Sequence, residues 1–221
     1  MEKKVLPTSY KAIGYIVNPS KAYIDTGVKS KGGNKIIITA RFTQNNDKDR
    51  WDQNNYIIGS SEYCYRVMTD GSYRTEIISN NGKLTALKNG KGYWSSIPID
   101  LEKHTYTLDT VGKNLIFGMD GKILYDKQTD YVQAGNVSIH IFESDFLYHF
   151  FTNIEIYGLK IWDMNYNLIR DMQPCLNAEG VYGMWDYANG KFYGSSNSVG
   201  LSGGVCRVIN LLTLCEERRA A

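Results

Sequence analysis

The sequence predicts an all-β protein folded as an antiparallel sandwich or barrel. At least ten short segments of strand-like pattern follow one another at a spacing of roughly 8–12 residues. Asp-Gly and Asn-Gly pairs separate several of them, and these pairs are strong hairpin signals because both central residues of the turn need positive φ. Seventeen tyrosines and an aromatic share of 13% suit pleated, half-buried surfaces.

The first half of the chain contains seven of the expected strands. Two of them flank a turn at Pro19, where proline fixes φ, and a third is rich in β-branched residues. These three strands are Ala12–Val17, Ala22–Thr26 and Lys35–Phe42. The next four are separated by Gly-Ser, Asp70-Gly71 and Asn81-Gly82, and they are Asn55–Gly59, Glu62–Met68, Ser72–Ser79 and Lys83–Lys88.

The second half continues the same pattern. Its expected strands are His104–Asp109, Asn114–Met119, Lys122–Tyr125, Asn136–Phe142 and Phe151–Trp162. Within the last of these, Ile154–Trp162 has apolar residues on both faces, which predicts a position near the middle of the sandwich. A shorter strand then carries Arg170 and Asp171, for which a structural ion pair is favoured over a binding role. The Asn189-Gly190 turn should place Trp185–Tyr187 opposite Lys191–Tyr193.

Composition excludes several classes of function. The 221 residues suffice for one domain with a buried core, and the net charge of +2 is spread evenly, so nucleic acid and acidic membranes are not expected partners. Four cysteines without a CxxC pair and three scattered histidines predict no metal site. No apolar run reaches the roughly 20 residues that span a bilayer, and the N-terminus lacks the apolar segment of a secretion signal.

The C-terminal segment has the only helix-like spacing in the sequence. Val208, Leu211 and Leu212 fall on one face if Cys206–Arg219 is helical. We therefore expect one domain over residues 1–204 and a tail over residues 205–221. Two interpretations of the tail stay open: a packed terminal segment, or a docking or oligomerisation helix that makes the protein a homo-oligomer.

Both ends of the domain resemble a known family. The opening contains Tyr15-Ile16 and then Tyr23-Ile24-Asp25-Thr26-Gly27, and the closing part contains Leu168-Ile169-Arg170-Asp171, Pro174-Cys175, Gly183-Met184-Trp185-Asp186 and Gly190-Lys191-Phe192-Tyr193. These motifs resemble the laminin-G-like, concanavalin A-like jelly-roll domains of phage virion proteins and bacterial surface proteins. The resemblance covers about residues 8–204, and it implies two antiparallel sheets packed face to face. The chain departs from the family after Gly204.

The resemblance also raises the question of catalysis, because retaining β-glucanases share the fold. Their signature is similar to Glu-x-Asp-x-x-Glu, with two carboxyl groups about 5–5.5 Å apart. This chain has Glu143 and Asp145 but Tyr148 in the last position, so the leaving group has no obvious proton donor. No GxSxG, GxGxxG or P-loop motif is present. The sequence therefore predicts a protein that is not an enzyme, with a glycoside hydrolase as the less favoured alternative.

Two polar loops are the candidate ligand sites. The first, Asn45–Asn55, contains Trp51 and Asn54, and the second, Asn89–Ser96, contains Tyr93 and Trp94. Exposed aromatics in polar loops often mark contact sites and can stack on a sugar ring. The alternative is that both tryptophans fold back over sheet edges or over the mouth of the sandwich. Three aspartates of the first loop offer oxygen ligands for Ca²⁺, although a solvated loop is favoured because the spacing is not that of an EF-hand.

The function expected from these observations is a non-enzymatic structural or adhesion protein of a tailed phage, located in the virion. Its partners would be other virion proteins or further copies of itself, and it could also bind host surface glycans. The alternative is a carbohydrate-binding module of a bacterial surface protein. No cofactor is expected.

Overall fold

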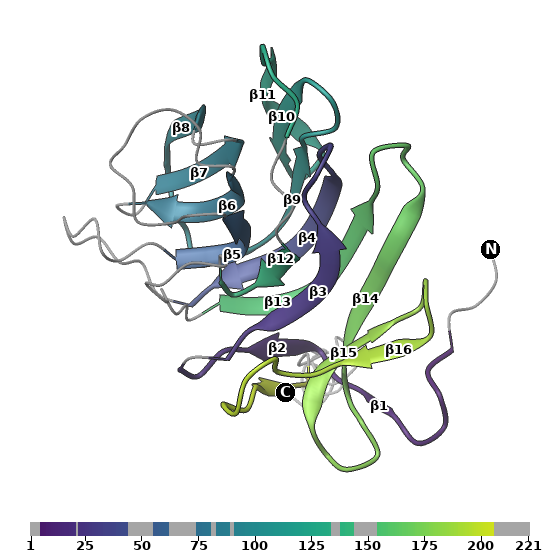
Figure 1. The fold of residues 1–221 in the computed structure, drawn as a ribbon. Helices are drawn as coiled ribbons and strands as arrows, with labels where there is room; N and C mark the ends of the chain where they lie inside the picture. The colour runs from purple at the N-terminus through teal and green to yellow at the C-terminus, as the bar shows by residue number, and fades with distance from the viewer. Residues whose placement is uncertain are drawn as a thin grey trace, which may run out of the picture.

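The structure is a computed structural model that describes residues 5–20, 22–43, 55–61, 74–80, 83–88, 91–133, 138–143 and 154–205. Every regular element in these ranges is a β-strand, and the strands form two sheets (Figure 1). Among the described residues, no helix is long and apolar enough to cross a membrane. The expected all-β class is therefore confirmed.

The larger sheet has eleven strands, all antiparallel to their neighbours. In spatial order the main path is β11 (Lys122–Gln128), β10 (Asn114–Met119), β9 (Lys103–Asp109), β4 (Lys35–Phe42), β13 (Ile154–Trp162), β14 (Leu168–Leu176), β15 (Tyr182–Asp186) and β16 (Lys191–Tyr193). Three short strands extend it: β1 (Lys11–Ala12) pairs with β14, and β2 (Tyr15–Val17) pairs with β13 and with β17 (Ser202–Gly204). The position of β13 between β4 and β14 confirms the central place predicted for it.

The smaller sheet has six strands and lies against the larger one (Figure 1). Its order is β3 (Ile24–Lys29), β12 (Ser138–Ile141), β5 (Asn55–Ser61), β6 (Arg74–Asn80), β7 (Lys83–Lys88) and β8 (Lys91–Pro98). A single hydrophobic core fills the space between the two sheets. On β4, Ile36, Ile38, Ala40 and Phe42 are buried, and the residues between them are half-buried. This strict alternation separates a core face from an outer face.

Arg170 on β14 connects the larger sheet to the edge of the smaller one. Its Nε donates a hydrogen bond to the carbonyl oxygen of Thr26 on β3 (2.9 Å) and lies 3.5 Å from Oδ2 of Asp186. Its guanidinium also lies over the ring of Tyr193, at 5.4 Å. Arg170 therefore has the structural role that the sequence favours, and its charged partner is Asp186 on the next strand.

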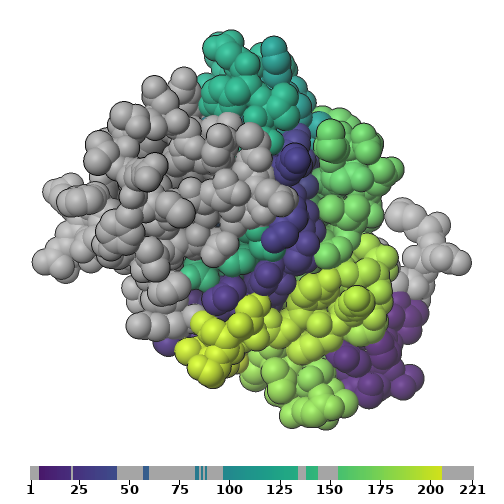
Figure 2. Space-filling view, viewed as in Figure 1, coloured from purple at the N-terminus to yellow at the C-terminus, as the bar shows by residue number. Residues whose placement is uncertain are grey.

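The N-terminal segment lies against the closing strands, as Figure 2 shows for the purple and yellow-green parts of the surface. The ring of Tyr10 is 4.9 Å from that of Trp185 and 5.7 Å from that of Phe192. Trp185 is paired with Phe192 across the β15–β16 hairpin, which confirms the tight turn expected at Asn189-Gly190. The two ends of the described chain thus stabilise one another.

Most expected strands are present, and one expected loop is wrong. Residues 91–98 form β8, whereas the sequence predicts a loop at Asn89–Ser96 that carries Tyr93 and Trp94. Lys88 pairs with Lys91, so only Asn89 and Gly90 connect β7 to β8, and that dipeptide is itself a hairpin signal. The expected strand Ala12–Val17 divides into β1 and β2. The expected strand Glu62–Met68 lies outside the described residues.

Candidate functional site

The outer face of the larger sheet brings together polar and aromatic side chains from distant parts of the chain. Strand register places Lys35 of β4 directly opposite Asp109 of β9 on one side and Trp162 of β13 on the other. Residues paired in this way project from the same face of a sheet. Because Ile36 and Leu108 point into the core, Lys35, Asp109 and Trp162 all lie on the outer face.

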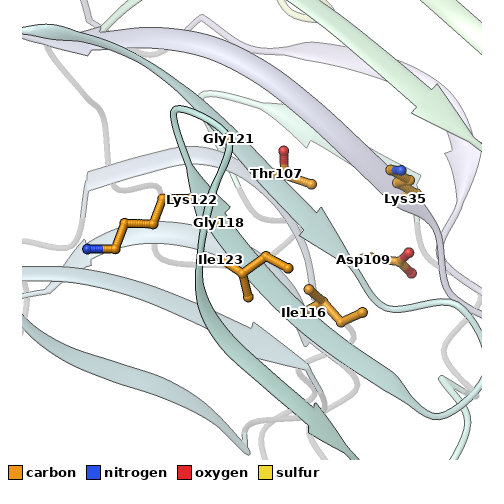
Figure 3. Close-up of a pocket in the computed structure, with 8 residues that line it drawn as sticks. All are labelled: Lys35, Thr107, Asp109, Ile116, Gly118, Gly121, Lys122 and Ile123. Carbon is orange, nitrogen blue, oxygen red and sulfur yellow. The ribbon is translucent and has the colours of Figure 1, made fainter.

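A groove of about 290 Å³ opens on this face where β4, β9, β10 and β11 lie side by side (Figure 3). The lining residues come from all four strands and from the β10–β11 turn: Lys35, Thr107, Asp109, Ile116, Gly118, Gly121, Lys122 and Ile123. The volume is close to the lower end of the range for small-ligand pockets.

Aliphatic and glycine residues form the floor of the groove. Gly118 is buried at the point where the register between β10 and β11 shifts, and a Cβ added there would meet the carbonyl oxygen of Lys122 at 2.9 Å. The absence of a side chain at Gly118 therefore leaves the two backbones close together and the groove open. Ile116 and Ile123 supply apolar surface beside it, and Ile123 is 61% exposed.

Asp109 is held at one end of the groove by fixed hydrogen bonds. Its Oδ1 accepts from the backbone N–H of Val111 (3.0 Å), and its Oδ2 accepts from the hydroxyl of Tyr166 (3.1 Å). The side-chain amide of Asn114 donates to the same Tyr166 hydroxyl (3.2 Å). Burial, and then the charge of Asp109, raises the pKa of Tyr166, so its hydroxyl stays protonated and remains a donor at neutral pH.

Lys35 supplies the cationic group of the groove. Its Nζ lies 5.7 Å from the centroid of the Trp162 ring, within the range of a cation–π contact. Figure 3 shows that the Lys122 side chain, in contrast, points away from the other lining residues. Lys35 and Thr107 therefore offer donors, and Thr107 and Asp109 offer acceptors, around an apolar floor.

Lys88 supports the groove from the interior. It is fully buried on β7, and its Nζ donates to the backbone carbonyls of Gly112 and Asn114, both at 2.8 Å. These carbonyls flank the start of β10, the strand that carries Ile116 and Gly118. Burial lowers the pKa of Lys88 to about 8, and the charge of Asp109 partly opposes that change. The buried ammonium thus connects the smaller sheet to the strand beneath the groove.

Glu143, the first carboxylate of the glucanase-like motif, occupies a different part of the fold. It follows β12 and is buried, and its Oε2 lies 3.9 Å from Nδ1 of His140. The imidazole of His140 stacks on Tyr23 at 4.8 Å, and its Nε2 lies 3.8 Å from Asp25. The distances from the imidazole nitrogens to Glu143 and Asp25 are longer than hydrogen bonds. Asp145 and Tyr148, the other two positions of the motif, lie outside the described residues.

None of the residues that line this groove is one of the contact residues predicted from the sequence. Trp51 and Asn54 lie outside the described residues, as do the three aspartates considered for Ca²⁺. Tyr93 and Trp94 lie on β8, the edge strand of the smaller sheet, where they pair with Ala86 and Thr85. The tail residues Val208, Leu211 and Leu212 also lie outside the described part, so the division at residue 204 and the docking role stay predictions.

Sequence reasoning missed the groove residues because each occurs singly within a strand. The alternation of Lys35–Phe42 indicates that Lys35 faces outward, but nothing local indicates that Asp109 and Trp162 lie beside it. Within the described ranges, no group of three or more His, Cys, Asp or Glu side chains could hold a metal ion.

Comparisons with known proteins identify the fold. No protein-family model matches the chain, and no curated protein matches it in sequence. Among solved structures, a heptameric SAP-like pentraxin from Limulus polyphemus is similar, with 10% sequence identity and a TM-score of 0.50 over 91% of this chain and 96% of that chain. Mouse laminin α1 domains LG4-5 show 9% identity and a TM-score of 0.46 over 73% of this chain and 43% of that one. A carbohydrate-binding module, CBM66 from Bacillus subtilis, shows 11% identity and a TM-score of 0.33, with 66% and 92% covered.

The chain therefore has the concanavalin A-like jelly-roll fold, as the resemblance of its two ends implied. Identities this low show the fold alone, and a fold hosts many functions. The structures named above include no virion protein, so a role in a phage particle stays a prediction. The fold is compatible with both binding and catalysis, so the choice between them depends on the residues of the site.

Proposed function

We propose that this protein is a non-catalytic glycan-binding module and that the groove lined by Thr107, Asp109 and Ile123 is its binding site. The observation that carries the proposal is the composition of the groove. An apolar floor of Ile116, Gly118 and Ile123 lies within a rim of hydrogen-bonding groups. A pyranose ring has the matching surface, with C–H groups on its faces and hydroxyls around its edge.

The fixed groups of the rim favour recognition of hydroxyls. Both oxygens of Asp109 are held by protein donors, which orients the carboxylate, and each oxygen keeps a further lone pair for a ligand. Preorganised polar groups around an apolar floor are typical of small-ligand sites. Trp162, beside Lys35, adds an aromatic surface at the edge of the groove.

The number of carboxylates in the groove favours binding over hydrolysis. Glycoside hydrolases use a pair of carboxyl groups about 5–9.5 Å apart. Among the described residues that line the groove, Asp109 is the single carboxylate, so the groove lacks the pair that hydrolysis uses. The proposal therefore assigns no catalytic step to this site.

Binding to a glycan array, followed by calorimetry with the best ligand, tests the proposal. Ile123→Asp should weaken binding at least tenfold, about 1.4 kcal/mol, because it removes apolar floor and adds a charge. Thr107→Phe should have a similar effect by filling the groove. Val181→Asp is the matched control, since Val181 is another exposed aliphatic residue and lies on the turn before β15. A blank array, or a bound glycan whose affinity neither groove variant changes, would refute the proposal.

A further inference from the structure

The outer face of the larger sheet continues beyond the groove as a track along β4. The outward residues of this strand are Lys35, Ile37, Thr39 and Arg41, each half-buried. Lys35 and Arg41 are about 20 Å apart at the usual rise of roughly 3.3 Å per residue. On either side, β9 contributes Asp109, Thr107, Thr105 and Lys103, and β13 contributes Trp162, Lys160, Gly158 and Glu155, each in register with β4.

The two acidic residues of the track are already engaged within the protein. Glu155 accepts two hydrogen bonds from Arg41, both at 2.8 Å, and a third from the hydroxyl of Tyr157. Asp109 is held at both oxygens, as described above. Arg41 and Glu155 neutralise one another, whereas Asp109 keeps its negative charge because both of its donors are neutral.

Three lysines of the track form no ion pair with any residue that the structure describes: Lys35, Lys103 and Lys160. Two of them are positioned over aromatic rings, with Lys35 over Trp162 at 5.7 Å and Lys103 over Tyr157 at 5.0 Å. Ring contacts of this kind restrict the ammonium groups without neutralising them. With Arg41 and Glu155 paired, three lysines stand against the single carboxylate of Asp109, so the track has an excess of positive charge although the chain as a whole is nearly neutral.

The three ammonium groups are distributed along the length of β4. Register places Lys35 at one end of the strand, Lys160 opposite Ile37, and Lys103 opposite Arg41 at the other end. Between Lys160 and Lys103 no large side chain projects from the sheet, because the paired residues there are Thr39, Thr105 and Gly158. Thr39 and Thr105 hydrogen-bond to each other through their hydroxyls, at 3.0 Å. A single sugar in the groove would contact Lys35 alone, whereas a linear chain along β4 would reach all three.

We infer that the ligand of this face is a linear acidic oligosaccharide, which lies along β4 with one residue in the groove and its carboxylate or sulfate groups near Lys35, Lys160 and Lys103. The inference rests on the proposed function and specifies its ligand class. The three lysines lie on β4, β13 and β9 and follow the direction of β4, so the track suits a single linear anionic chain.

Calorimetry with matched pairs of oligosaccharides tests the inference. One pair is a galacturonic acid oligomer and its methyl ester, and the other is a sulfated dextran oligomer and unmodified dextran. We expect one acidic member to bind about tenfold more tightly than its neutral counterpart, with an affinity that falls as salt is added. The two pairs distinguish a carboxylate from a sulfate ligand.

Variants distinguish the track from the groove. Lys103→Gln and Lys160→Gln should each weaken binding of the acidic oligomer about two- to fivefold, as expected for solvent-exposed ion pairs. Lys191→Gln, which removes an exposed charge on β16, should leave binding unchanged. If neutral and acidic oligomers bind equally through an Ile123-dependent site, the inference fails and the proposed function stands. If neither type of glycan binds, both fail. Equal, lysine-dependent binding of a single-stranded DNA oligomer would also overturn the inference, because the face would then recognise any polyanion.

Discussion

Removal of the Arg41 guanidinium should destabilise the protein more than removal of the carboxylate that it binds. The Glu155 side chain is 8% exposed, whereas that of Arg41 is 42% exposed. Arg41→Ala therefore leaves a buried carboxylate whose remaining partner is the Tyr157 hydroxyl. Glu155→Ala leaves a guanidinium that can turn towards water. The cost of orphaning a charge depends on its burial, so the two substitutions should not be equivalent.

The structure sets the expected size of each effect. Breaking a fully buried ion pair costs about 3–5 kcal/mol, and an exposed pair contributes about 0–1 kcal/mol. With one partner buried and the other half exposed, we expect about 2 kcal/mol for Arg41→Ala and about 1 kcal/mol for Glu155→Ala. The double variant should cost less than the sum, with a coupling energy of about 1–2 kcal/mol.

Urea unfolding followed by tryptophan fluorescence measures all four proteins of this cycle. Equal costs for the two single variants would show that burial of Glu155 does not matter. A coupling energy below about 0.5 kcal/mol would show that the pair is screened like any surface pair. Either result would refute the reasoning, and it would also remove the argument that Glu155 is neutralised within the track.

Three further predictions concern the stability of the fold. Between pH 7 and 9.5, the unfolding free energy of the wild type should rise by about 2 kcal/mol relative to that of Lys88→Met. The pKa of Lys88 is about 8 in the folded state and 10.5 in the unfolded state, so the folded state binds fewer protons over this range. For His104, burial lowers the pKa, but hydrogen bonds to Asp120 and Asp100 outweigh this effect, so the pKa is raised in the folded state. The extra stability of the wild type over His104→Gln should therefore be complete below about pH 6.5, and it should be lost as the pH rises through the folded pKa. Gly33→Ala should cost at least about 3 kcal/mol in urea unfolding, because φ is +87° and the added Cβ would lie 1.9 Å from a backbone oxygen.

Each of these predictions has a contrary outcome. Parallel pH profiles for the wild type and Lys88→Met would show that the buried lysine has an ordinary pKa. A stability difference for His104→Gln that grows with rising pH would have the opposite sign to the one expected from a raised histidine pKa. A Gly33→Ala variant as stable as the wild type would show that the turn before β4 adjusts without strain.

Local strand signals allowed much of the fold to be predicted. The predicted bounds Lys35–Phe42, Lys83–Lys88 and Asn114–Met119 agree with β4, β7 and β10. In these cases the strand pattern of the segment and the turn residues beside it are visible in the local sequence. The failure at β8 has a physical reason. Glycine and serine around Tyr93 and Trp94 resemble a loop, and pairing with β7 outweighs that local preference.

The candidate site could not be predicted in the same way. Lys35, Asp109 and Trp162 meet because β4 lies between β9 and β13, and that order depends on contacts between distant segments. The sequence indicates which residues of β4 face outward, but the identity of their neighbours requires the register. The same holds for Lys88, whose partners are backbone carbonyls at the start of β10 in the other sheet.

The most direct test of the central claim is the location of the ligand on the protein. Amide chemical shifts of labelled protein, followed by NMR as the tightest-binding oligosaccharide is added, report that location residue by residue. We predict that the largest changes occur on β4, β9 and β10, around Lys35, Thr107 and Gly118. Changes confined to the smaller sheet, around Trp94 on β8, or no saturable changes with any glycan, would contradict the account.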